Sequence, residues 1–169
     1  MHIFRKENEK DISAIHSLIK AAFGQKNEAD LVDALRKAGA LTLSAVAVQN
    51  CEIVGHIAFS PVTIESSDKS FDALRLAPMA VRPDCQRQGI GTGLIRWSLD
   101  ECRRMGHGVV IVLGHPEYYS RFGFTSAAAR GIQCPFTVPS EAFMMIELLP
   151  DALGGHSGTI KYRPGFDMI

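Results

Sequence analysis

The sequence has 169 residues, of which 46% are hydrophobic and 21% are charged, and its 18 basic and 18 acidic side chains give a formal net charge of zero. This length favours a single domain over residues 1–169, long enough to bury a core without disulfides or a structural metal. The zero net charge argues against broad electrostatic attraction to nucleic acid or to an anionic membrane surface. It does not exclude a local positive pocket.

The cysteines and the N-terminal residues predict a cytoplasmic protein. Cys51, Cys85, Cys102 and Cys134 are far apart and show no CxxC spacing, so we expect no metal site. The first residues lack the apolar stretch of a secretory signal, and no segment approaches the roughly 18 uninterrupted apolar residues of a membrane helix. We therefore expect reduced thiols, and neither a membrane nor a nucleic-acid partner.

The N-terminal part of the chain predicts a short strand followed by two helices. Ile3 to Arg5 is a strand candidate, and Asn8 is expected to cap a helix that Gly24 ends. Apolar residues recur between them at helical spacing. Glu28 to Lys37 predicts a second helix, which ends before Gly39.

The middle of the chain predicts three strands. Leu41 to Val48 is apolar and partly alternating, and Ile53 to Ile64 returns after a turn as its partner. Asp72 to Val81 predicts a third strand, which Pro83 ends. We expect these strands to belong to one central sheet.

The second half of the chain predicts a crossover between parallel strands. Gly89 to Met105 is the strongest helical pattern, and Val109 to Leu113 has the apolar, β-branched composition of a strand buried on both faces. The helix is therefore expected to join two neighbouring parallel strands by a right-handed connection. A short helix over Glu117 to Phe122, a strand near Gly123-Phe124 and a last strand over Phe143 to Leu148 follow. This order predicts an α+β domain with a central mixed sheet covered by helices.

A glycine-rich loop lies between the third strand and the strongest helix. It reads Gln86-Arg87-Gln88-Gly89-Ile90-Gly91-Thr92-Gly93. Glycine lets a backbone approach a ligand closely, and the free N–H groups at a helix start attract anions. Arg82 and Arg87 are expected to add positive charge beside the loop. This combination favours a pyrophosphate as the ligand.

Three phosphate-binding patterns compete for this loop. A P-loop is excluded because no lysine follows the glycines. A Rossmann turn needs GxGxxG directly after the first strand of the domain, whereas this loop lies in mid-chain and no acidic residue ends the next strand. The coenzyme A signature Q/R-x-x-G-x-G/A is matched by Gln86, Gly89 and Gly91. The remaining alternative is an ordinary glycine-rich helix start.

With these motifs the sequence resembles the GNAT superfamily of N-acetyltransferases. Leu76 to Pro83 looks like the fourth strand of that fold, Gln86 to Gly91 like its pyrophosphate loop, Val109 to Leu113 like its fifth strand, and Tyr118 to Phe124 like its YxxxGF motif. Further segments look like the YhbS-like branch of bacterial acetyltransferases: Gly55 to Ser60, Pro116 to Tyr119 and Cys134 to Pro139. The resemblance extends over nearly the whole chain and implies a GNAT-like fold with splayed fourth and fifth strands.

The resemblance implies that acetyl-CoA is the co-substrate and that two segments bind it. Met79, Ala80 and Val81 would pair with the pantetheine arm, and a backbone N–H near Met79 would polarise the thioester carbonyl. The pyrophosphate would lie on the loop residues, which are Gln86, Arg87, Gln88, Gly89, Ile90, Gly91 and Thr92.

Tyr119 stands where the resemblance implies the general acid that protonates the leaving thiolate. A phenol with an ordinary pKa of about 10 is protonated at neutral pH and can donate that proton. The alternative role of Tyr119 is packing, because Tyr118, Phe122 and Phe124 surround it in the sequence. We expect Tyr118 to be structural.

The general base is less determined by the sequence. Glu28 is the first candidate, because it lies near the start of the second helix, which overlies the acceptor site in such folds; its alternative is a solvated first-turn carboxylate. Glu141, His56 and His115 are the other candidates, and a water relay is also open.

The loop and Tyr119 together predict an acetyl-CoA-dependent N-acetyltransferase that moves an acetyl group to a primary amine by direct attack. The alternatives are a catalytically silent coenzyme A-binding sensor on the same fold and a nucleotide-binding protein. The acceptor, a small-molecule amine or a protein amine, is open, as is the choice between monomer and homodimer. Four aromatic residues are expected to line the acceptor site: Phe23, Phe59, Phe136 and Phe143.

Overall fold

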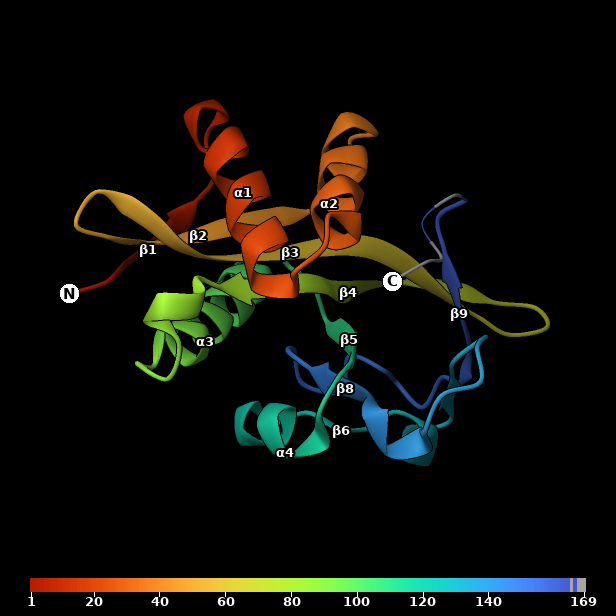
Figure 1. The fold of residues 1–169 in the computed structure, drawn as a ribbon. Helices are drawn as coiled ribbons and strands as arrows, with labels where there is room; N and C mark the ends of the chain where they lie inside the picture. Colours follow the sequence, from red (N-terminus) through yellow and green to blue (C-terminus); the bar gives the residue numbers. More distant parts are fainter. Residues whose placement is uncertain (165, 167–169) are drawn as a thin grey trace. The chain divides into compact units, whose positions relative to one another are not determined.

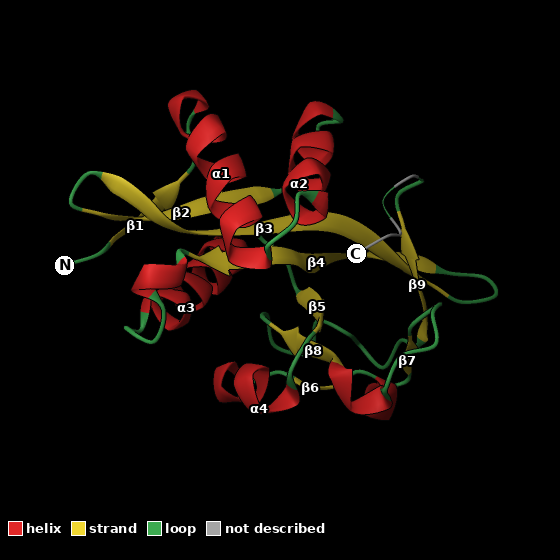
Figure 2. Ribbon diagram, viewed as in Figure 1, coloured by secondary structure: helices red, strands yellow, loops and turns green. Residues whose placement is uncertain are grey.

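The computed structural model describes residues 1–164 and 166, which form four α-helices and nine strands (Figure 1, Figure 2). The predicted domain, 1–169, extends over residues 165 and 167–169, which lie outside the described residues. The helices are α1 (Ile12–Phe23), α2 (Asn27–Lys37), α3 (Ile90–Arg104) and α4 (Pro116–Tyr119). The strands are β1 (Ile3–Lys6), β2 (Leu43–Gln49), β3 (Glu52–Glu65), β4 (Ser70–Val81), β5 (Val109–Leu113), β6 (Thr125–Ser126), β7 (Ile132–Gln133), β8 (Phe143–Glu147) and β9 (Gly158–Tyr162).

The strands form a mixed sheet in the order β1-β2-β3-β4-β5-β8-β6, and β9 pairs with both β3 and β7. The pairs β4–β5 and β7–β9 are parallel, whereas β1–β2, β2–β3 and β5–β8 are antiparallel. The helix α3 therefore connects two neighbouring parallel strands, as predicted from the pattern around it. The predicted α+β class with a central mixed sheet is confirmed.

The ladder between β4 and β5 is short. It joins Leu74 to Val110 and Arg75 to Ile111. On its other side β5 pairs with β8 along its whole length, from Val109 to Leu113. Among the described residues, the part of β4 after Arg75 therefore has no ladder partner in β5, which is the feature expected of splayed strands.

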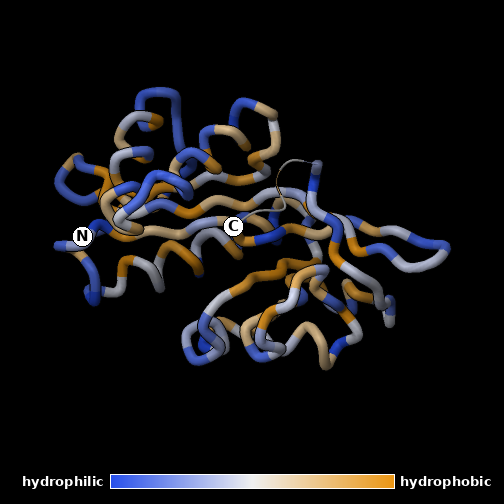
Figure 3. Tube along the Cα trace, turned by 45° about the vertical axis from the view of Figure 1, so that its right-hand side comes forward, coloured by the Kyte–Doolittle hydropathy of each residue, from blue (hydrophilic) through white to orange (hydrophobic). Residues whose placement is uncertain are grey.

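The chain divides into two compact units, each of which is described here by itself. The first unit contains Met1–Ser60 and Ala77–Asp100. In it, α1 and α2 lie on one face of β2 and β3, and α3 lies on the opposite face (Figure 1). Its core is made of buried aliphatic side chains, among them Ile19, Val32 and Leu94. Figure 3 shows hydrophobic residues concentrated along the strands and hydrophilic residues on the turns and the outer parts of the helices.

Asn8 caps a 3₁₀ turn (Glu9–Asp11) that leads directly into α1, and not α1 itself, whereas Gly24 ends α1 as predicted. The Asn8 side chain accepts a hydrogen bond from the Lys10 N–H (3.0 Å), and an Asp11 carboxylate oxygen accepts one from the Asn8 N–H (2.8 Å), which forms a capping box. Asp11 also pairs with both terminal nitrogens of Arg5 on β1, at 2.7 and 3.1 Å. Gly24 ends α1 with φ +70°. These contacts attach the start of α1 to the edge of the sheet.

The second unit contains Pro61–Leu76 and the chain from Glu101 onward. Its core cluster includes Ile111 on β5, Met145 on β8 and Ile160 on β9, all at most 2% exposed. The prediction that β5 is buried on both faces is confirmed, because four of its five residues are buried.

The prediction that Phe143–Leu148 is the last strand is wrong, because β9 follows it. β9 is antiparallel to β3, with Ile64 opposite Ile160 and Val62 opposite Tyr162. Ile160 and Tyr162 are buried and Lys161 between them is exposed, which is the alternation of a half-buried strand. No helix of the described residues is long and apolar enough to cross a membrane.

Candidate functional site

The glycine-rich loop follows β4 and a 3₁₀ turn (Pro83–Cys85) and leads into α3. Gln86, Arg87, Gln88 and Gly89 are exposed. Arg87 has φ +64° and Gly89 has φ +82°, so the backbone takes left-handed conformations at two nearby positions. A Cβ built on Gly89 meets no atom of the described chain within 4 Å. Gly89 is therefore required for the backbone conformation and leaves open space in front of it.

The start of α3 adds unsatisfied donors to this open space. The Gly93 N–H donates to the Gly89 carbonyl at 3.0 Å, so the N–H groups of Ile90 to Thr92 precede the first intrahelical hydrogen bond. The first turn of α3 contains no acidic residue that could occupy them. Such N–H groups and the partial positive charge of the helix end together form an anion site.

Two hydrogen bonds hold the loop against the strands of the first unit. The Gln86 side-chain amide donates to the Val81 carbonyl (3.2 Å) at the end of β4. The Arg82 N–H donates to the Val54 carbonyl (2.8 Å) on β3. The glutamine of the coenzyme A signature thus fixes the distance between the end of β4 and the loop.

Arg82 does not supply the free positive charge expected from the sequence. Its guanidinium pairs with Glu52 (2.7 Å) and with Asp84 (2.7 Å). The hydrogen bond from Arg82 lowers the pKa of the Asp84 carboxyl. The expectation for Arg82 is therefore wrong, and Arg87, which is exposed, is the arginine available to a phosphate.

The third glycine of the loop serves packing. A Cβ on Gly93 would lie 2.4 Å from Cζ of Phe4, which is far inside van der Waals contact. Gly93 therefore lets α3 lie close to β1, and its role differs from that of Gly89.

Tyr119, the predicted general acid, lies in α4 of the second unit and is 9% exposed. Its ring makes edge contacts with Tyr118 (5.2 Å between centroids) and Phe124 (5.6 Å). Burial, with a smaller contribution from Tyr118, raises the pKa of Tyr119 to about 12. The phenol is therefore protonated at neutral pH, and it packs in an aromatic cluster as well.

The backbone conformation at Gly123 explains the glycine of the YxxxGF motif. Gly123 ends the 3₁₀ turn after α4 with φ +98°, a conformation that L side chains rarely adopt. A Cβ there would also lie 3.2 Å from Cδ1 of Ile146. Gly123 thus turns the chain so that Phe124, 2% exposed, enters the core beside Tyr119.

Glu28 stands in the first turn of α2 and is buried, at 9% exposure. Gln25 Nε2 donates to both of its carboxylate oxygens, at 2.9 and 3.0 Å. The alternative of a solvated carboxylate at this position is therefore wrong. A buried carboxylate held by one neutral amide keeps acceptor capacity for a further donor.

His56 is a buried part of the first unit's core rather than an accessible base. Its Nε2 lies 2.8 Å from Ser44 Oγ, and Ser44 donates to Glu7, which pairs with Arg36 at 2.7 and 2.8 Å. Its Nδ1 has no hydrogen-bond partner among the described residues. Burial lowers the pKa of His56 to about 4, although Glu7 acts in the opposite direction. The other two candidates, His115 and Glu141, are exposed.

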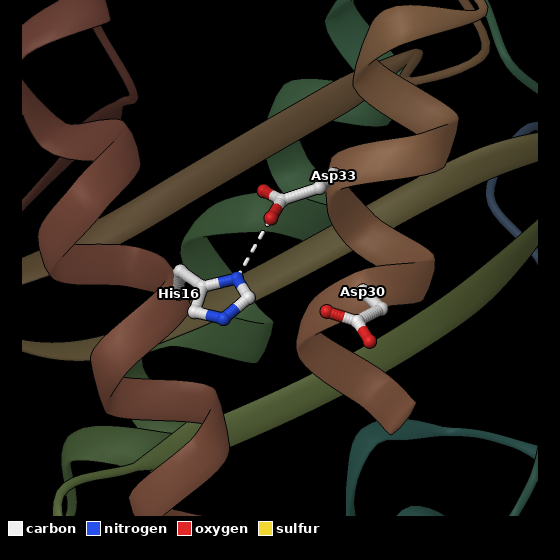
Figure 4. Close-up of side chains that lie close together, drawn as sticks. All are labelled: His16, Asp30 and Asp33. Atoms are coloured by element: carbon white, nitrogen blue, oxygen red, sulfur yellow. Dashed lines mark hydrogen bonds and ion pairs between the residues drawn. The ribbon is translucent and has the colours of Figure 1, made fainter. Parts of the chain in front are cut away.

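The hydrogen-bonded chain continues from Arg36 to the surface of α1 and α2. His16, Asp30 and Asp33 lie close together there, with one potential ligand atom of each within 4.8 Å of the others (Figure 4). One oxygen of Asp33 lies 2.7 Å from His16 Nδ1, and the other accepts from Arg36 at 2.9 Å. Both oxygens of Asp33 thus have a hydrogen-bond partner, and the bond to His16 links α2 to α1.

Two of the four aromatic residues expected at the acceptor site belong to the core. Phe59 is 0% exposed and Phe143 is 2% exposed, so neither lines an open pocket, and the expectation is wrong for them. Phe23 (42%) and Phe136 (36%) are exposed, and Phe136 stacks on Tyr162 with ring centroids 5.6 Å apart.

Comparison with known proteins supports the same family as the loop and the motifs. The sequence model of the family described as "Acetyltransferase (GNAT) domain" matches residues 4–127. The protein named "Uncharacterized N-acetyltransferase YhbS" of Escherichia coli K12 is 35% identical over 166 residues, which cover 98% of both chains.

Two crystal structures are similar over nearly the whole chain. The structure of YhbS from Escherichia coli in complex with CoA has a TM-score of 0.92 at 34% identity, covering 99% of this chain and 92% of that one. A GNAT family acetyltransferase from Brucella melitensis in complex with acetyl-CoA has a TM-score of 0.80 at 35% identity, covering 98% of both chains. This chain therefore belongs to the GNAT family of acetyltransferases, enzymes that take their acyl group from acetyl-CoA. The predicted fold and the prediction of an acyltransferase are confirmed, whereas the individual site residues stay predictions.

The buried His56 predicts a loss of stability in mild acid. Unfolded histidine has a pKa of about 6.5, whereas the pKa of folded His56 is about 4, so the unfolded state binds a proton first as the pH falls. The free energy of unfolding should fall by roughly 2 to 3 kcal/mol between pH 6.5 and 4.5 on this account. Urea unfolding at several pH values measures this slope. In His56→Gln the slope over this window should be much shallower, and equal slopes would show that His56 is not its cause.

Proposed function

We propose that this protein transfers the acetyl group of acetyl-CoA to a primary amine by direct attack, with the coenzyme's pyrophosphate bound on Gln86 to Thr92. The observation that carries the proposal is the exposed turn at Gly89, which has φ +82° and opens onto the start of α3. The N–H groups there suit a diphosphate, and the exposed Arg87 adds a full charge. The CoA and acetyl-CoA complexes of the relatives support the same ligand.

The pantetheine arm is proposed to pair with the backbone of Met79, Ala80 and Val81. Support comes from the short β4–β5 ladder, which ends at Arg75 and leaves later backbone groups of β4 without a ladder partner in β5. Backbone N–H and C=O groups need partners, and an amide-containing arm supplies them. An N–H near Met79 would then stabilise the oxyanion of the thioester, an effect typically of about 3 kcal/mol.

The chemical step needs a base, a nucleophile and an acid. The neutral amine forms a C–N bond to the thioester carbon, the C–S bond breaks, and the ammonium proton passes to the base. We propose Glu28 as this base, because among the described residues its buried carboxylate is held by Gln25 and has capacity to accept a further hydrogen bond. We propose Tyr119 as the acid that protonates the coenzyme A thiolate, because its raised pKa keeps the phenol protonated.

The proposal also includes the acceptor, the oligomeric state, the partners and the location of the protein. The acceptor is a small-molecule or protein amine, and the protein acts as a single domain over residues 1–169, as a monomer or homodimer. The zero net charge supports the absence of a nucleic-acid partner. We further propose a cytoplasmic location with reduced cysteines, and no metal cofactor, because the four cysteines lie far apart in the sequence without CxxC spacing.

Coenzyme binding is tested by Gly89→Glu. The added carboxylate would lie at the proposed pyrophosphate position, so acetyl-CoA affinity measured by calorimetry should fall by at least about 100-fold through charge repulsion and lost N–H contacts. Gly39→Glu is the matched control, because Gly39 also has a positive φ (+68°) and open space around its Cβ position. The loop assignment fails if both variants bind acetyl-CoA like the wild type.

The proposed acid is tested by Tyr119→Phe, which keeps the ring and removes the hydroxyl. The turnover number should fall by about 10² to 10⁴, the usual contribution of a general acid, with acetyl-CoA affinity nearly unchanged. Tyr118→Phe, on the neighbouring ring, is the control and should keep its activity. Wild-type turnover in Tyr119→Phe across the pH range would remove Tyr119 from the mechanism.

The proposed base is tested by Glu28→Gln, which keeps the shape of the side chain and removes its negative charge. Turnover should fall by about 10² or more while acetyl-CoA still binds, because the amide cannot take the amine proton. His115→Gln and Glu141→Gln, measured in parallel with the same amine, should keep most of their activity. A larger loss in either of these variants than in Glu28→Gln would transfer the role of base to that residue.

A further inference from the structure

Gly114 lies between the end of β5 and the start of α4, and its backbone is held in place. Its N–H donates to the Ala142 carbonyl at 2.9 Å. This bond extends the β5–β8 ladder one residue beyond the pair Leu113–Phe143. The φ angle of Gly114 lies outside the left-handed region, so the backbone conformation there does not require glycine. The absence of a side chain at this position must therefore be explained by a close neighbour.

The space beside Gly114 is filled by the ring of Tyr119. A Cβ on Gly114 would lie 2.3 Å from Cε2 of Tyr119, 2.9 Å from Cδ2 and 3.3 Å from Cζ. Real Cβ atoms essentially never approach other heavy atoms closer than 3.0 Å, so either the ring or the strand must shift. The closest atom, Cε2, is bonded to the carbon that carries the hydroxyl.

The other contacts of the ring leave it little freedom. Tyr118 meets it edge to face with an interplanar angle of 88°, and Phe124 meets it at 71°. Its backbone N–H donates to the His115 carbonyl at 3.1 Å. Buried side chains at interior packing density cannot move far without displacing their neighbours. The backbone at Gly114 thus limits the position of the Tyr119 ring on one side.

We propose that Gly114 is a positioning residue for the reaction: its missing side chain sets the place of the Tyr119 hydroxyl. The proposal rests on the proposed function, in which Tyr119 is the general acid. A methyl group at position 114 would have to separate from Cε2 by about 1 Å more to reach ordinary contact at 3.4 Å. A misplacement of about 1 Å of a catalytic group can cost about 100-fold in rate.

The kinetic test is Gly114→Ala with Gly108→Ala as its matched control. Gly108 stands just before β5, and a Cβ there would lie 2.7 Å from Cβ of Ala152, so the same substitution also crowds an apolar neighbour of the second unit. Gly114→Ala should lower the turnover number by 10- to 100-fold with unchanged acetyl-CoA affinity. Gly108→Ala should lose thermal stability and keep its turnover number. Equal turnover numbers in the two variants overturn the proposal.

A double variant separates positioning from general damage. If Gly114 acts through the hydroxyl, Gly114→Ala should lower turnover no further in a Tyr119→Phe background, where the hydroxyl is already absent. A further fall of 10-fold or more in that background overturns the proposal. Wild-type turnover in Tyr119→Phe alone would instead refute the acid of the proposed function, and the titration below would then decide the position of the ring by itself.

The pKa of Tyr119 reports the burial of its ring independently of the reaction rate. Absorbance-monitored titration of the wild type, with Tyr119→Phe subtracted, isolates this phenol, whose pKa burial raises to about 12. In Gly114→Ala the displaced ring should lose part of its burial, and its pKa should move toward the ordinary value of about 10. A pKa of Tyr119 in Gly114→Ala equal to the wild-type value overturns the proposal whatever the kinetics show.

A stability measurement covers the case in which Gly114→Ala unfolds. In a Tyr119→Leu background, which removes the ring, the same substitution should cost far less free energy of unfolding than in the wild type. An equal cost in both backgrounds would mean that the added methyl group clashes with something other than Tyr119, and the proposal would fall.

Discussion

The N–H groups at the start of α3 cannot be satisfied within the helix, and the first unit is arranged so that they stay accessible. The chain enters α3 through left-handed backbone conformations at Arg87 and Gly89. The glutamine that could fold over the helix end, Gln86, donates to the Val81 carbonyl instead. Arg82, at the end of β4, forms ion pairs with Glu52 and Asp84. In the proposed function these backbone N–H groups are the donors that meet the pyrophosphate.

A second constraint is the burial of polar groups across the first unit. His56, Ser44 and Glu7 lead from the middle of the sheet to Arg36 on α2. Hydrogen bonds inside a protein must be nearly complete to offset desolvation, and burial acts to raise the pKa of Glu7. The bonds from Arg36 and Ser44 outweigh burial, so the pKa of Glu7 is lowered and the carboxylate stays charged. These hydrogen bonds therefore hold α2, which carries Glu28, against the end of β1 and against β2.

Much of the fold could be predicted because its signals are local. The cap at Asn8, the stop at Gly24, the apolar run of β5 and the glycines before α3 each depend on a few neighbouring residues. The errors involve partners distant in the sequence. Nothing near Arg82 indicates a pair with Glu52, 30 residues away. The burial of Phe59 depends on what covers its strand, and the five residues of β9 are too few to stand out among glycines and turns. Gly114 carries no sequence signal, because its neighbour in space is decided by how α4 folds back.

Three glycines of this chain differ in what lies in front of them, and the difference should extend to its relatives. Gly89 has open space in front of it, Gly93 adjoins Phe4, and Gly114 adjoins Tyr119. In homologues that lost the second or third glycine, the facing aromatic residue should have changed with it, because the pair shares one volume. Gly89 has no such partner among the described residues. Its loss should therefore occur without a matching change elsewhere in the sequence, in homologues that no longer bind the coenzyme. Covariation between homologous sequences would thus separate glycines kept for packing from a glycine with open space in front of it.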